Sequence, residues 1–249
     1  QKMSTIYQRG LKSTDIFTTM IDGSVGYIQI PMILNYSGND SITIAHTLKI
    51  RNQLCALEQQ GPKGYIIDLR ANIGGSFYPM FAGLGELFPN MHLGGDTKNG
   101  KEYYSEWTLQ NGNLYNNDYA VPNMPALKCG IELGTRRVAV LVGRFTASSG
   151  EALASGLRGQ NNIRLIGEQT SGASTTNSFR YISDDVQFNP AVAYYMSKDG
   201  TVHTDGIIPD QVIVEEYNMD HVLEGKTITE ATKWIQYGDT YVPGKSSMD

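Results

Sequence analysis

The residues best suited to chemistry lie in one segment, Phe145-Thr-Ala-Ser-Ser-Gly-Glu151, in which Ser148 could act as a nucleophile. The segment follows an apolar, β-branched run, Val138 to Val142, which is typical of a buried strand. It leads into residues 151–157, which are good helix formers. A serine between a strand and a helix can lie at the C-terminal edge of a sheet, beside helix-end N–H groups that stabilise negative charge.

The same residues also have a purely structural interpretation. Ser148 and Glu151 have the spacing of a capping box, in which serine and glutamate satisfy each other's free backbone N–H groups. Such boxes occur at the starts of helices of any function. The choice between a helix cap and a nucleophile therefore depends on the rest of the chain.

A second turn could complete a catalytic site. Gly74 and Gly75 follow a predicted strand at residues 64–70, and glycines let the backbone come close to a substrate carbonyl. With the amide of Ser149 they could stabilise the oxyanion that forms when Ser148 attacks. Taken alone, the glycine pair fits a simple turn equally well.

Two strand–helix–strand units position these turns. They comprise residues 25–30, 39–60 and 64–70, and residues 138–142, 151–157 and 162–167. Such units predict an α/β fold with parallel strands, in which reacting groups gather at the C-terminal ends of the strands. A last helix is predicted from Thr227 to Gln236, with Thr227 and Glu230 as its capping box.

We expect one catalytic domain within residues 1–249, with its core at about residues 25–214. Residues 90–135 are polar, show no clear period and carry turn signals such as Asn111-Gly112. Long stretches of this kind are usually functional lids or binding insertions, or else a series of hairpins. The sequence therefore predicts that residues 76–136 form a cap or lid over the site.

Composition excludes several classes of protein. The net charge of −5 and the lack of a basic cluster argue against a nucleic-acid partner. No apolar run is long enough to span a membrane. Cys55 and Cys129 allow one disulfide at most, and neither lies in a CxxC motif, which excludes a zinc or redox motif. The 15 tyrosines and 27 glycines favour an extracytoplasmic location.

Four segments together resemble the carboxy-terminal processing (tail-specific) serine peptidases, a family that includes tricorn-like members. Gly64–Gly75 resembles the family's DLRxNxGG segment, and Phe145–Glu151 resembles the nucleophile segment, which aligns Ser148 with the catalytic serine. Ile166–Gly172 matches the GExTxG strand end, and Gly206–Asp210 matches the late GxxPD turn. Each motif alone is weak, but four in the family's order make the resemblance specific.

The resemblance implies a ClpP/crotonase-like α/β core and hydrolysis of peptide bonds through an acyl-enzyme on Ser148. It also implies an oxyanion hole made by Gly74 or Gly75 with the Ser149 amide. The implied partner is a peptide or protein substrate, and neither a cofactor nor a metal is implied. Many relatives carry a PDZ domain before the core, for which residues 1–24 leave no room. Substrate selection would then fall to the insertion or to upstream sequence.

The chain departs from the family at the general base. Many members use a lysine in a GKG triplet after GExTxG, but here the triplet is Gly172-Ala173-Ser174, and a methyl group cannot accept a proton. The remaining option in the family is the tricorn-like one, a histidine in a DGHS-like segment before the first core strand. Residues 1–24 contain no histidine. We therefore expect the base to lie upstream of Gln1.

The four histidines of the chain offer one further candidate. His46 falls within a predicted helix, and His92 and His221 fall in polar loops, so packing or surface roles are favoured for these three. His203 precedes the GxxPD turn, where tricorn-like members place an acidic residue of the active site. Asp205 could fill that acidic role and orient a histidine, or His203 could itself be the base.

Three functions compete on this evidence. The serine, the paired glycines and the GxxPD turn favour a serine endopeptidase. The missing lysine and histidine favour a relative that has lost activity and binds peptides or apolar ligands. A crotonase-type acyl-CoA enzyme would share the fold class, but it gives no reason for the Thr-Ala-Ser-Ser-Gly-Glu segment.

Overall fold

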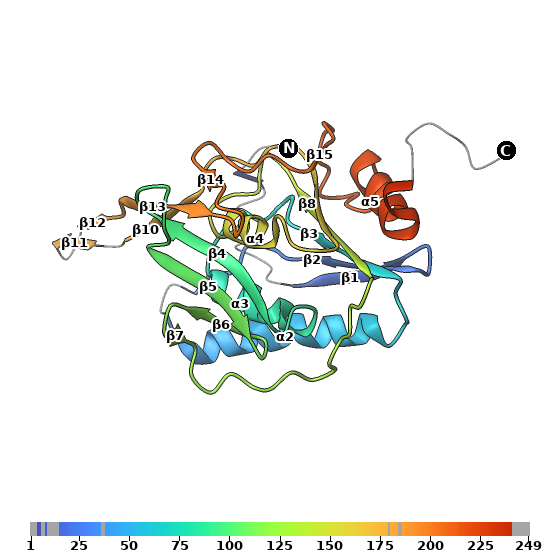
Figure 1. Ribbon diagram of the computed structural model, residues 1–249, viewed down its shortest axis with the longest axis horizontal. Helices are drawn as coiled ribbons and strands as arrows, with labels where there is room; N and C mark the ends of the chain where they lie inside the picture. The colour runs from blue at the N-terminus through green and yellow to red at the C-terminus, as the bar shows by residue number, and fades with distance from the viewer. Residues whose placement is uncertain are drawn as a thin grey trace.

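The computed structural model describes residues 4–5, 8, 15–35, 38–178, 180–183 and 186–240. Two sheets and the helices packed on them form an α/β fold, as the sequence predicted (Figure 1). The first sheet has the strand order β1 (Phe17–Ile21), β2 (Val25–Gln29), β3 (Gly64–Asp68), β8 (Arg137–Val142), β9 (Ile163–Gly167) and β15 (Gln211–Val212). All neighbours in it are parallel except β1 and β2.

Both faces of this sheet are covered, which explains the continuous apolar runs of its strands. Successive residues of β3 point to opposite faces: Ile67 joins a core with α2, α3 and α4, and Ile66 joins a core with α5. In Figure 1, α2 lies along the bottom of the molecule and α5 lies at the right. The central strands β3 and β8 are thereby held rigidly, and the turns that follow them are the predicted catalytic turns.

The helices predicted at residues 39–60, 151–157 and 227–236 begin within two residues of those positions, and a further helix begins after residue 76. They are α2 (Asp40–Glu58), α3 (Phe77–Gly83), α4 (Ser149–Leu157) and α5 (Lys226–Tyr237), with short 3-10 turns η1 (Leu84–Glu86) and η2 (Gly238–Thr240). Asn39 caps α2 as predicted, accepting hydrogen bonds from the N–H groups of Ser41 and Ile42. No helix in the described ranges is long and apolar enough to cross a membrane.

The predicted cap of α5 is wrong. Thr227 is buried inside the first turn, and Gly225 holds the N-cap position. The carboxylate of Glu215 accepts hydrogen bonds from the N–H groups of Lys226 and Thr227, at 2.6 and 3.2 Å. The carboxylate of Glu215 therefore caps the helix in place of the Thr227 side chain. This contact joins residues that are distant in sequence, so the local pattern could not show it.

The second sheet is antiparallel and contains much of the predicted insertion. Its strand order is β10 (Thr175–Asn177), β13 (Ala191–Met196), β4 (Met91–Thr97), β5 (Ser105–Gln110), β6 (Asn113–Asn116) and β7 (Tyr119–Ala120), and β14 (Val202–His203) also pairs with β13. Residues 90–120 are thus a run of short hairpins, one of the two alternatives that the sequence left open. Trp107, Leu109 and Leu114 join the main core, so the segment packs on the domain itself. Its role as a cap over the site stays a prediction.

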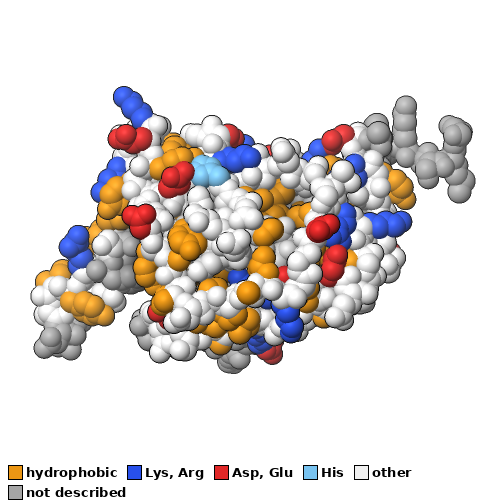
Figure 2. Space-filling view, turned by 60° about the horizontal axis from the view of Figure 1, so that its bottom comes forward, with side chains coloured by type: hydrophobic (Ala, Val, Ile, Leu, Met, Phe, Trp, Pro, Cys, Tyr) orange, Lys and Arg blue, Asp and Glu red, His pale blue; other side chains and the backbone are white. Residues whose placement is uncertain are grey.

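A small ribbon extends from this sheet. It consists of β11 (Arg180–Ser183) and β12 (Val186–Phe188), which pair only with each other within the described residues. Figure 1 shows it projecting at the left, and Figure 2 shows hydrophobic side chains at that projection. Tyr181 and Ile182 are 77% and 71% exposed, so both faces of the ribbon present apolar groups.

A strap at residues 121–136 returns the chain from the second sheet to β8. A disulfide joins Cys129 in the strap to Cys55 in α2, so the two cysteines form the one disulfide that the sequence allowed. The buried carboxylate of Glu86 accepts hydrogen bonds from the N–H groups of Lys128 and Cys129, at 2.6 and 3.1 Å. A bond that closes a loop of this length contributes about 4 kcal/mol to stability in the chain-entropy model.

Candidate active site

Ser148 lies between β8 and α4 in an unusual backbone conformation. Its φ and ψ are 51° and −120°, a region that residues with a side chain rarely adopt. The Ser148 N–H donates to the carboxylate of Glu151 at 3.1 Å, and its carbonyl accepts from the Glu151 N–H at 2.8 Å. Backbone strain that the surroundings enforce in this way is concentrated at functional sites. The side chain stays partly exposed at the C-terminal edge of the sheet.

The glycine turn after β3 lies directly against this serine. A Cβ atom on Gly74 would come within 2.8 Å of the Ser148 Cβ and 3.2 Å of its Oγ. Asn72 aligns the two turns, because its Oδ1 accepts from the Gly74 N–H and its carbonyl accepts from the Ala147 N–H, both at 2.9 Å. Gly74 has a φ of +112°, so both its conformation and its neighbour require glycine.

Two backbone amides at this junction are available to a ligand. Within the described residues, neither the Gly75 N–H nor the Ser149 N–H has a hydrogen-bond acceptor. The two residues are in contact, since the Ser149 hydroxyl donates to the Gly75 carbonyl at 2.5 Å. The Gly74 N–H, in contrast, is already engaged by Asn72. An oxyanion beside Ser148 would therefore find donors on Gly75 and Ser149.

Glu151 does more than cap α4. Its carboxylate is fully buried and accepts hydrogen bonds from Thr170 Oγ1 at 2.5 Å, from the Gly172 N–H at 2.9 Å and from Ser174 Oγ at 2.9 Å. Thr170 and Gly172 belong to the GExTxG segment after β9, and Ser174 ends the Gly172-Ala173-Ser174 triplet. One carboxylate thus joins the Ser148 amide to the segment in which the family's lysine would lie.

Neither His203, the basic candidate, nor Asp205, the acidic candidate, forms a hydrogen bond with the Ser148 hydroxyl in the described structure. His203 is buried on β14, where its Nε2 lies 2.7 Å from Ser197 Oγ. Burial, with Arg158 nearby, lowers the pKa of His203 to about 4, so this imidazole is neutral at neutral pH. Asp205 is exposed, and its carboxylate accepts from Thr204 Oγ1 at 2.9 Å.

The other histidines have partners elsewhere or lie on distant elements. His92 Nε2 lies 2.7 Å from Glu106, His221 Nδ1 lies 2.8 Å from Glu224, and His46 lies on α2. Ala173 is exposed beside Gly172, in the position where a lysine would be needed. Across the described residues, no histidine or lysine side chain forms a hydrogen bond with Ser148.

Sequence reasoning missed Tyr195, which lies on β13 beside the hydrogen-bond network of Glu151. Its side chain is 5% exposed, and its N–H donates to the carbonyl of Ser174 at 3.1 Å. Burial, followed by the carboxylates of Asp96 and Glu151, raises the pKa of the Tyr195 phenol. No local motif marks Tyr195, because only the pairing of β13 with β4, β10 and β14 brings it to this network.

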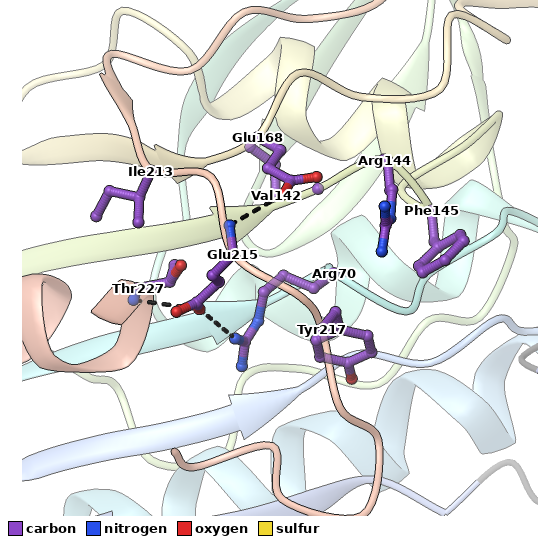
Figure 3. Close-up of a pocket in the computed structure, with 10 residues that line it drawn as sticks. Arg70, Val142, Arg144, Phe145, Glu168, Ile213, Glu215, Tyr217 and Thr227 are labelled. Carbon is purple, nitrogen blue, oxygen red and sulfur yellow. Dashed lines mark hydrogen bonds and ion pairs between the residues drawn. The ribbon is translucent and has the colours of Figure 1, made fainter. Parts of the chain in front are cut away.

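The pocket in Figure 3 is separate from the serine. It lies where β3, β8 and β9 end, against the first turn of α5, and neither Ser148 nor the paired glycines line it. The guanidinium of Arg70 lines this pocket and pairs with the carboxylates of Asp68 at 2.7 Å and Glu215 at 3.5 Å. Its central carbon lies 4.9 Å from the ring centre of Tyr217. The DLR part of the motif therefore contributes Arg70 to this pocket, while the NxGG part forms the turn beside Ser148.

Comparison with known proteins places the chain in a class. Residues 24–213 match the model of Peptidase family S41, and the chain belongs to that family. The resemblance to the carboxy-terminal processing peptidases is thereby confirmed.

Individual relatives agree with this assignment. The chain is 28% identical over 196 residues to the carboxy-terminal processing protease CtpA of Bacillus subtilis, covering 78% of this chain and 36% of that protein. It is 27% identical over 184 residues to the nisin-resistance protein of Lactococcus lactis subsp. lactis, covering 74% and 54%. The chain thus spans between about a third and about half of the length of these curated relatives.

Solved structures show the same fold. A lipoprotein from Streptococcus agalactiae superposes with a TM-score of 0.67 at 24% identity, covering 94% of this chain and 74% of that one. The photosystem II D1 C-terminal processing protease superposes with a TM-score of 0.54 at 20% identity, covering 80% and 48%.

Proposed function

We propose that the protein is a serine peptidase that cleaves peptide or protein substrates through an acyl-enzyme on Ser148. The observation that carries this proposal is the strained Ser148 backbone beside the unengaged amides of Gly75 and Ser149. A helix cap alone leaves the Ser149 N–H free, but it requires neither the strain at Ser148 nor an unengaged Gly75 N–H beside it. Membership of Peptidase family S41 supports the same reaction class.

The reaction would proceed in two stages. The Ser148 hydroxyl loses its proton to a base and attacks the scissile carbonyl, whose oxygen then carries the negative charge between the Gly75 and Ser149 amides. Collapse of this intermediate breaks the C–N bond, and the leaving amine takes the proton. Water then attacks the ester on Ser148 in the same way and releases the acid product. We assign the hole to Gly75 rather than Gly74, because Asn72 occupies the Gly74 N–H.

The general base is proposed to come from the part of the protein upstream of Gln1. Ala173 cannot accept a proton, and the Nε2 atom of His203 is occupied by Ser197. His203 would have to leave a buried site to reach Ser148, so it is the second candidate. The exposed carboxylate of Asp205 could orient an incoming histidine, since its main chain lies against Gly172.

The disulfide supports an extracytoplasmic location. Cys55 and Cys129 are both engaged in one bond, and such bonds persist mainly in oxidising compartments.

The alternative function, a relative that binds peptides without cleaving them, is favoured by a single observation. In the described structure, no basic side chain lies against Ser148.

The test is hydrolysis of an unfolded protein such as reduced casein, measured with residues 1–249, with the longer native chain, and with Ser148→Ala in each. The longer chain should cleave casein, and residues 1–249 should be slower by several orders of magnitude, because a serine without its base retains only oxyanion stabilisation and binding. Ser148→Ala should abolish the activity of the longer chain.

Two results would change this account. Equal rates for the two chains would mean that the base lies within residues 1–249, and His203 would then be the first residue to substitute. Casein binding without cleavage by any of the proteins would support the binding function instead.

A further inference from the structure

One hairpin runs from the hydrogen-bond network of the candidate site out to the exposed ribbon. β10 begins at Thr175, directly after Ser174, whose Oγ donates to the carboxylate of Glu151 at 2.9 Å. The ladder between β10 and β13 continues outward, because the Ser178 N–H donates to the Pro190 carbonyl at 3.1 Å. β11 and β12 follow on the two arms of this hairpin. The ribbon is therefore the outer half of the hairpin that borders the site.

The ribbon presents aromatic side chains on both of its faces. Arg180 pairs with Phe188 and Tyr181 pairs with Gln187, and successive pairs of a ladder point to opposite faces. Phe188 and Tyr181 thus lie on opposite faces, and they are 53% and 77% exposed. A two-stranded ribbon is at best marginally stable in water. Apolar groups left exposed on both of its faces indicate that the ribbon contacts another molecule.

The size of this apolar surface distinguishes between kinds of partner. An aromatic side chain carries about 150–250 Å² of surface, so the exposed fractions amount to about 400–500 Å² for the four large apolar side chains, Tyr181, Ile182, Val186 and Phe188. A patch of this size marks a contact site. A stable dimer, in contrast, buries about 800 Å² on each partner. The ribbon is therefore too small for a lasting interface with a second copy, and it fits a chain that binds transiently.

Charge and hydrogen bonding favour an extended polypeptide over a lipid surface. The two residues between β11 and β12 in the sequence are Asp184 and Asp185, and acidic groups are repelled by anionic lipids. Within the described residues β11 and β12 pair only with each other, so the outer edges of both strands have backbone groups to offer. An extended chain can add to such an edge through its main chain and place apolar side chains against the exposed rings.

We propose that the β11–β12 ribbon is a docking site for extended, apolar segments of unfolded protein substrates. This inference rests on the proposed peptidase function. Tyr181 lies seven residues beyond Ser174, a distance of at most about 23 Å for a strand. A substrate therefore needs about seven residues on one side of the scissile bond to reach the ribbon from Ser148. The ribbon contributes to the binding of long substrates and not to the chemical step.

The experiment compares two double variants of the longer native chain. Tyr181→Ser with Ile182→Ser removes apolar groups from the ribbon. Val212→Ser with Val214→Ser is the matched control, because these side chains are 61% and 77% exposed but lie at the edge of the first sheet. Binding of fluorescein-labelled reduced casein is measured by anisotropy with Ser148→Ala added to each protein. Steady-state hydrolysis is measured on casein and on a hexapeptide that copies the casein bond cleaved fastest by the wild type.

We expect the ribbon variant to bind casein about 10-fold more weakly and to raise KM for casein about 10-fold with kcat unchanged, because two apolar contacts are lost from binding alone. Its hydrolysis of the hexapeptide should equal that of the wild type, since six residues cannot reach the ribbon. The control variant should match the wild type on both substrates.

Equal casein affinities for the ribbon and control variants would overturn the inference. An equal loss on the hexapeptide would also overturn it, because the ribbon would then support the site itself. A dimer, or binding to vesicles of anionic lipid, that only the ribbon variant loses would assign this surface to a second copy or a membrane instead. If the wild type binds casein but cleaves nothing, the proposed peptidase function fails, and the anisotropy comparison still decides whether the ribbon binds unfolded chains.

Discussion

Replacing Glu151 with alanine is expected to lower the free energy of unfolding by about 3–5 kcal/mol, because it removes the acceptor of several buried donors at once. The N–H groups of Ser148 and Gly172 cannot reorient, and within the described residues both depend on this carboxylate. Peptidase activity should fall further than the loss of folded protein accounts for, since the hydrogen bonds of Glu151 that fix Ser148 relative to the GExTxG segment would be gone. Urea unfolding and casein hydrolysis measure the two effects.

Glutamine at position 151 gives a sharper version of the same test. Oε2 of Glu151 accepts from the Ser148 N–H, and Oε1 accepts from the Gly172 N–H. The NH2 group of a glutamine would therefore face a backbone N–H, donor against donor, in either orientation of the side-chain amide. Glu106→Gln is the matched control, because that side chain is 53% exposed and pairs with His92. It should change stability by less than about 0.5 kcal/mol. Equal unfolding free energies for the two glutamine variants would contradict the role assigned to Glu151.

Gly74→Ala is expected to lower the rate of casein hydrolysis by at least about 100-fold, the size of effect seen when a catalytic geometry is displaced by an ångström. The added methyl would lie 2.8 Å from the Ser148 Cβ, which is closer than two such atoms can approach. A residue with a side chain is also strained at a φ of +112°, so the backbone of residue 74 cannot easily relieve this contact. The serine must therefore shift from the Gly75 and Ser149 amides. Steady-state kinetics at saturating casein report the loss.

Gly200→Ala separates this contact from backbone strain. Gly200 also has a positive φ, +82°, but a Cβ there would meet nothing within 4 Å. Both variants should lose about 1–2 kcal/mol of stability through strain, but only Gly74→Ala should lose activity. A fully active Gly74→Ala protein would show that the close approach of the two turns is not needed for catalysis.

The strands and helices of the first sheet could be predicted because local patterns and tertiary packing agree there. β3 and β8 are buried on both faces, so their apolar runs carry the signal, and Asn39 caps α2 with its own side chain. The two motif turns follow directly from these strands. The positions of Ser148, Gly74 and Gly75 at one edge of the sheet are therefore consequences of local sequence and parallel pairing.

The features that were missed all depend on contacts between distant residues. The β4–β7 hairpins are short, and Gly94 and Gly95 interrupt their alternation, so no period was visible. Glu215 caps a helix eleven residues away, as its hydrogen bond to Lys226 shows. Tyr195 joins the hydrogen-bond network of Glu151 only through the second sheet, where its N–H donates to Ser174. Such contacts have no local signature to read.

The central claim, that Ser148 is the nucleophile, is tested most directly by treating the longer native chain with a fluorophosphonate and locating the adduct by mass spectrometry. Trypsin cleaves after Arg144 and Arg158, so Ser148 falls within one peptide of residues 145–158. We expect the adduct on Ser148 in folded protein, and none in heat-denatured protein or in Ser148→Ala. An adduct on a different residue, with Ser148→Ala still cleaving casein at the wild-type rate, would contradict the account.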